Sequence, residues 1–95
     1  MPSYRVSLAV GLLQPGVDPA DVLPAAAGAA RELVTVEAWD VGVVRGRARI
    51  TVRFTAASDD EAHGVADAVR DRVEVLADTF GGQLTRRWGH HWHPA

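Results

Sequence analysis

Residues 34 to 56 read VTVEAWDVGVVRGRARITVRFTA, and this stretch decides the fold. Both halves are rich in β-branched residues, and Arg45-Gly46 separates them as a turn in which glycine takes a positive φ at little cost. We therefore predict a β-hairpin with arms over 34–44 and 47–56. In the second arm, apolar residues alternate with arginine and threonine, so one face of the hairpin is buried and the other is polar.

Two further strands are expected on either side of this hairpin. Residues 4–13 alternate with the same period of two, which predicts a strand with its apolar side turned to the core. The segment 83–93 is expected to be the last strand. Its parity is chosen so that Leu84, Trp88 and Trp92 face the core.

Two helices are predicted between these strands. The first covers about 19–33, where Asp18 is the N-cap and the interior Pro24 delays or kinks the helix. The second begins at the capping box SDDE, residues 58–61, and is expected to run to about Phe80, with Gly81-Gly82 as its C-cap. Its buried stripe has helical spacing, and acidic residues line the opposite side.

The order strand, helix, strand, strand, helix, strand predicts an α+β fold of the ferredoxin-like type. This split βαβ sandwich (βαββαβ) has a four-stranded antiparallel sheet with both helices on one face. Residues 1–95 are expected to form one such domain, near the lower size limit for an adequate core, so a partner that covers apolar surface would help.

The composition excludes several chemistries. The chain has no cysteine, lysine or asparagine, so thiol nucleophiles, disulfides, cysteine-ligated zinc and Schiff-base lysines are absent. We expect no cofactor and assign no catalytic residue, and we favour a non-enzymatic protein over an enzyme. No apolar run is long enough to span a bilayer, and we expect a cytoplasmic protein without a membrane partner. The bias toward arginine, alanine, valine and glycine suggests a bacterial source.

The sheet face away from the helices is expected to be open and rich in arginine. Residues 45–53 hold four arginines and no acid, whereas residues 58–80 hold seven acids, although the net charge of the chain is only −2. The candidate ligand or interface residues on this face are Arg5, Glu37, Trp39, Arg49, Arg53 and Arg87.

Three functions compete for this face. The favoured one is protein association, most simply a homodimer through the open face or the edge strands, because arginine and tryptophan are enriched at interface hot spots. The alternative is a cavity between paired sheets, as in dimeric α+β barrels, that binds a small anion or acts as a cofactor-free enzyme. The third is nucleic-acid binding, which the acidic balance of the chain disfavours.

The histidines near the C-terminus form one more candidate site. His91 and His93 are two apart on a predicted strand, so both rings point the same way and could ligate zinc, nickel or copper. A metal site needs a third ligand, and the sequence has neither a cysteine nor a neighbouring acid to supply it. The simpler interpretation is a polar strand end beside the open face.

Overall fold

The computed structural model describes residues 1–95 and shows an α+β fold with two helices and a five-stranded antiparallel sheet. The strands are β1 (Ser3–Leu13), β2 (Val36–Val44), β3 (Arg47–Thr55), β4 (Ala77–Trp88) and β5 (His91–Pro94). The helices are α1 (Val22–Arg31), which follows a short 3₁₀ turn η1 (Pro19–Asp21), and α2 (Asp59–Glu74). The prediction of four strands is therefore wrong by one, because the last predicted strand is a hairpin.

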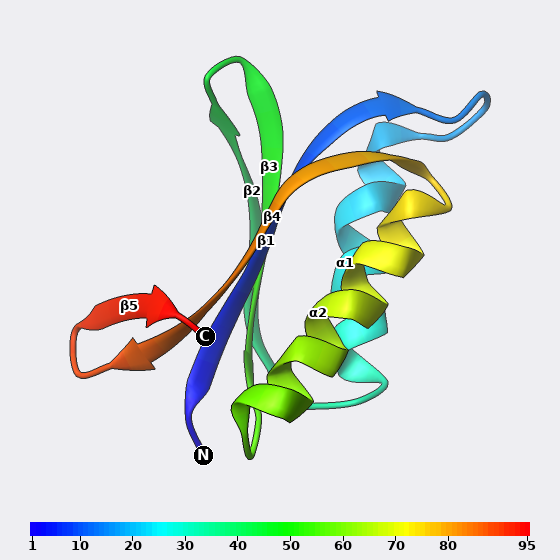
Figure 1. Ribbon diagram of the computed structural model, residues 1–95. Coiled ribbons are helices and arrows are strands. Elements are labelled where there is room, and N and C mark those ends of the chain that lie inside the picture. Colours follow the sequence, from blue (N-terminus) through cyan, green and yellow to red (C-terminus); the bar gives the residue numbers. More distant parts are fainter.

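The strands lie in the order β2-β3-β1-β4-β5, so β2 and β5 are the edges of the sheet. Both helices cover one face, which we call the helix face, and the opposite face has no helix on it (Figure 1). The β4–β5 hairpin bends away from the helices, toward the uncovered side. Neither helix is long and apolar enough to cross a bilayer.

The core lies between the sheet and the two helices. From the sheet, the register pairs Tyr4 with Phe54, Val6 with Val52 and Leu8 with Ile50, and all six side chains are buried. Small and β-branched residues complete the core from the helices, chiefly the alanines of α1 and the valines of α2. The predicted alternation of β1 and of β3 is thus confirmed where these strands meet.

The predicted hairpin turn and the start of the second helix are also confirmed, whereas the first α-helix begins later than predicted. Arg45 and Gly46 both have positive φ, 54° and 77°, as a two-residue turn between twisted strands requires. The Ser58 hydroxyl accepts from the Glu61 amide at 3.2 Å, and the Glu61 carboxylate accepts from the Ala57 amide. The Asp18 carboxylate caps η1, and the α-helix itself begins only at Val22.

The end of the second helix was predicted wrongly. Helix α2 stops at Glu74, and the chain enters β4 at Ala77, which pairs with Leu13 of β1 and is buried. Gly81-Gly82 is therefore not a C-cap. It lies inside β4 at a β-bulge, where Gly81 has a φ of 55° and the pairing with β1 shifts by one residue. Strand pairing with β1 overrides the helical spacing that extends to Phe80.

Arg86 ties the helix face of β4 to the start of α2. Its Nη1 donates to Asp59 Oδ1 at 3.1 Å, and the Tyr4 hydroxyl donates to the same oxygen at 2.6 Å. These two bonds, the Tyr4 bond first, hold the pKa of the Asp59 carboxyl below its usual value. Burial is the main cause of the raised pKa of the Tyr4 hydroxyl. Arg86 and Asp59 thus form an ion pair that links β4 to the first turn of α2.

Candidate functional site

The uncovered side of the sheet, which we call the open face, is polar and rich in arginine. Strand register places its residues, since partners across an antiparallel ladder share a face. Four of the six predicted interface residues belong to it by register or contact: Arg5, Arg49, Arg53 and Arg87. Glu37 joins them through an ion pair with Arg53 at 3.4 Å and a hydrogen bond from the Ser3 hydroxyl.

Trp39 lies on the helix face, contrary to the prediction. It pairs with the buried Val52, and the guanidinium of Arg31 at the end of α1 stacks on its ring at 4.2 Å. The cause is a bulge between Val36 and Ala38, which reverses the parity of the rest of β2. The two-residue turn at Arg45-Gly46 is the signal in the sequence that could have found this, since it fixes the pairing outward from Val44 and Arg47.

The tail also has the opposite parity to the one predicted. Gly89, with a φ of 61°, and His90 form a tight turn, so β5 runs back along β4 and Trp92 pairs with Arg87. Trp92 is therefore on the open face, where Arg5 stacks on its ring at 3.9 Å and Arg53 lies 5.4 Å from it. Trp88 keeps the predicted helix side but is half exposed and packs against Arg86.

The two candidate metal ligands, His91 and His93, also lie on the opposite face from the one predicted. His91 pairs with Trp88 and His93 with Arg86, so both histidines lie on the helix side of the β4–β5 hairpin and not on the open face. Their ring centroids are 6.2 Å apart. No group of three His, Asp or Glu side chains gathers around them or anywhere else in the structure.

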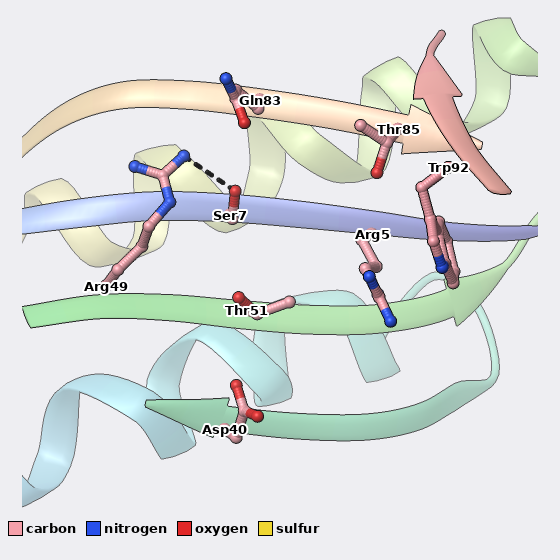
Figure 2. Close-up of a pocket in the computed structure, with 8 residues that line it drawn as sticks. All are labelled: Arg5, Ser7, Asp40, Arg49, Thr51, Gln83, Thr85 and Trp92. Atoms are coloured by element: carbon pink, nitrogen blue, oxygen red, sulfur yellow. Dashed lines mark hydrogen bonds between the residues drawn. The ribbon is translucent and has the colours of Figure 1, made fainter. Parts of the chain in front are cut away.

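A hollow of about 460 Å³ lies in the middle of the open face. Its floor is made by the short hydroxyl side chains of Ser7, Thr51 and Thr85, one from each of three neighbouring strands. Arg49 lies at one end and Arg5 with Trp92 at the other (Figure 2). The remaining lining residues are Asp40 and Gln83. The hollow exists because long side chains rise around a floor of short ones.

Arg49 is held at the hollow by two hydrogen bonds. Its Nη2 donates to the Ser7 hydroxyl and to the carbonyl of Gly81, both at 2.9 Å. The bulge at Gly81 turns that carbonyl toward the open face, so the backbone irregularity in β4 orients the guanidinium. The Nε and Nη1 groups of Arg49 have no protein acceptor, and they remain free to donate to a ligand.

Charge on the open face is only partly balanced. Arg5 and Arg53 are direct cross-strand partners, a like-charge pairing that is unfavourable by itself. Glu37 offsets Arg53, but Arg5 has no carboxylate partner and makes only its stacking contact with Trp92. The sequence identified Arg5 and Arg49 as candidates, but it did not single out Ser7, Asp40, Thr51, Gln83, Thr85 or Trp92 as part of the same site.

A second surface stands out at the β2 edge. From Ala38 to Val44 this strand pairs regularly with β3 on one side and with nothing on the other. It carries exposed apolar side chains, including Val41, 56% exposed, and Val43, 78% exposed. Asp40 is the one charged residue in this regular stretch.

Comparison of the chain with protein-family models, with curated proteins and with solved structures returns no match.

Proposed function

We propose that this protein is a small non-enzymatic association module that forms a homodimer through the β2 edge. The observation that carries the proposal is an edge strand with exposed apolar residues, on which Asp40 and a bulge near the start are the only protective features. Edges of natural sheets are kept from pairing by charges, prolines, bulges or short length. The one bulge of β2 lies near its start, and the seven residues after it offer a regular ladder.

The opposite edge is protected by contrast. Strand β5 has four residues, and one of them is Pro94, which lacks an amide proton for a ladder. Stacking the open faces of two copies has less support, because five arginines on that face (Arg5, Arg47, Arg49, Arg53 and Arg87) exceed its two acids, Glu37 and Asp40. Edge pairing leaves these arginines solvated.

One antiparallel register pairs the β2 edges of two copies without placing like charges opposite each other. With a twofold axis at Val41, Trp39 lies opposite Val43 of the second copy, and Asp40 lies opposite its Gly42. The apolar residues of the helix side then meet apolar residues, and no like charges face each other. At each end Glu37 comes level with Arg45, a complementary pair. The resulting sheet would be continuous across both copies.

The chain has no cysteine, so a single introduced thiol tests this register. Val41→Cys places two thiols across the twofold axis, where the strand spacing allows a disulfide. We expect oxidised Val41→Cys to run as a covalent dimer, and Ala38→Cys to stay uncrosslinked because its partner in this register is Val44. Equal crosslinking of both variants would contradict the register.

The dimer itself is tested by light scattering from 1 to 100 μM. The wild type should approach 20.4 kDa, twice the chain mass of 10.2 kDa. Val41→Lys should remain monomeric, since it sets two ammonium groups side by side on the axis. Val75→Lys is the matched control, because Val75 is equally apolar and 71% exposed but lies at the end of α2. A monomeric wild type would refute the proposal.

We also propose that β1 to β4 with the two helices form a ferredoxin-like unit to which β5 is added. What supports this is the order β2-β3-β1-β4 with antiparallel neighbours, and the helices on one face. The β5 strand then extends the sheet at the β4 edge and brings Trp92 over the open face.

A further inference from the structure

The hollow on the open face combines two cationic ends with a hydroxylic floor. We propose that it binds a small carboxylate that also carries hydroxyl groups. Its volume of about 460 Å³ is within the usual range of small-molecule sites. The proposal does not rest on self-association, because none of the lining residues except Asp40 belongs to β2.

Arg49 is the first anion contact. Its two bonds to Ser7 and Gly81 fix the guanidinium before any ligand arrives, which lowers the conformational entropy lost on binding. The uncommitted Nε and Nη1 groups lie on different edges of the guanidinium, since Nη2, which takes part in both bidentate edges, is bonded to Ser7 and Gly81. Each of these two groups can donate a charge-assisted hydrogen bond to a carboxylate oxygen.

Arg5 is the second cationic group and is fixed differently. Its guanidinium lies on the Trp92 ring at 3.9 Å, and no hydrogen bond or ion pair to the protein occupies its N–H groups. A stacked guanidinium keeps its in-plane donors available. The hollow therefore has oriented cationic donors at both ends, and the indole of Trp92 supplies an apolar wall.

Asp40 and the floor determine which anion fits. Asp40 makes no ion pair, so its carboxylate repels a ligand that presents negative charge on every side, such as phosphate. It favours a ligand with hydroxyl donors that lie opposite the anionic end. Ser7, Thr51 and Thr85 can each donate or accept, and they add contacts that a simple fatty acid cannot use.

The binding experiment uses four probes with the wild-type protein, followed by NMR shifts of backbone amides around Ser7 and Gly81. D-gluconate has both a carboxylate and hydroxyl groups, acetate has only the carboxylate, and sorbitol has only the hydroxyl groups. Inorganic phosphate is an anion that has no carboxylate and no hydroxylated chain. We expect gluconate to bind at least tenfold more tightly than acetate or phosphate, with no saturable shift from sorbitol. Absence of saturable gluconate binding at 50 mM, or phosphate binding as tight as gluconate, would overturn the proposal.

Matched variants locate the site. Arg49→Met keeps the length of the side chain and removes its charge, and it should weaken gluconate binding at least tenfold. Arg87→Met makes the same charge change on the same face but outside the hollow, and it should leave binding within twofold. Equal losses in the two variants would show general attraction to a basic surface and refute a built site.

Two further variants separate this proposal from its alternatives. Asp40→Asn should bind phosphate more nearly as tightly as gluconate. An unchanged ratio of the two dissociation constants would show that Asp40 does not determine this preference. Val41→Lys should bind gluconate as the wild type does, because the hollow lies within one copy of the chain. Loss of gluconate binding in Val41→Lys, with its fold intact by circular dichroism, would contradict a site complete in one copy. The dimer proposal is judged separately, by light scattering.

Discussion

Because Gly81 lies at a bulge with positive φ and Gly64 lies inside a helix, replacement by alanine should destabilise the fold at Gly81 and stabilise it at Gly64. Gly81 has a φ of 55°, a conformation that costs a residue with a Cβ about 1–2 kcal/mol. A Cβ there would meet only Arg49 Nη1, at 3.7 Å, so no steric clash adds to this cost. Gly81→Ala should therefore destabilise the fold by about 1 kcal/mol after the reduced chain entropy of the unfolded state is counted. The melting temperature should fall by about 4–8 °C.

Gly64 supplies the control for this reasoning. It lies inside α2, is exposed, and would place its Cβ in open space. Gly64→Ala should stabilise the fold by about 1 kcal/mol, since alanine favours a helix interior by about that much. Thermal unfolding followed by circular dichroism at one fixed protein concentration measures both variants, because self-association would raise the melting temperature. If the Gly81→Ala protein were as stable as the wild type, the positive-φ conformation of Gly81 at the bulge would be contradicted.

The remaining predictions concern the turn, a cap and the Tyr4–Asp59 contact. Arg45→Asn should raise the melting temperature by a few degrees, since Arg45 has a φ of 54° and asparagine tolerates this conformation better. Ser58→Ala should cost about 1 kcal/mol in urea unfolding through loss of the N-cap. Tyr4→Phe should cost about 1–2 kcal/mol in the same assay because the buried ring loses its hydrogen bond. The pKa of Asp59 is lowered in the folded protein, so ionised Asp59 stabilises the fold above its usual pKa of 3.8, and this stabilisation is lost as the pH falls through the folded pKa. In Asp59→Asn, the free energy of unfolding should depend less on pH in this acid range.

The core of the fold was predictable because it depends on local patterns. The alternation in β1 and β3, the Arg45-Gly46 turn and the Ser58–Glu61 capping box each lie within a short window of sequence. Each is decided by backbone preferences and by burial of one face. The end of α2 was not predictable in this way, since the spacing of Val73, Leu76 and Phe80 suits a helix, and only pairing with β1 makes residues 77 to 80 a strand.

The errors at the candidate site share a different cause, which is strand register. A shift of one residue exchanges the two faces of a strand. The bulge before Ala38 therefore places Trp39 on the helix face. The turn at Gly89 reverses the predicted faces of His91, Trp92 and His93. Both shifts were recoverable in principle, because a two-residue turn fixes the pairing of the strands that it joins. Counting outward from such turns is a stronger guide to the face of a side chain than counting inward from the apolar end of a strand.

The hollow shows why a site can be harder to predict than the fold that holds it. Its floor needs Ser7, Thr51 and Thr85 to lie side by side, and this depends on the pairing of β1 with both β3 and β4. Its orienting carbonyl exists only because the bulge at Gly81 turns the backbone toward Arg49. Each residue is unremarkable in its own strand, and a serine or threonine on a polar strand face indicates solvent as readily as a ligand. The chemical character of the open face therefore arises from register between distant segments, and variants that shift the register of β4 should abolish gluconate binding even where every lining residue is retained.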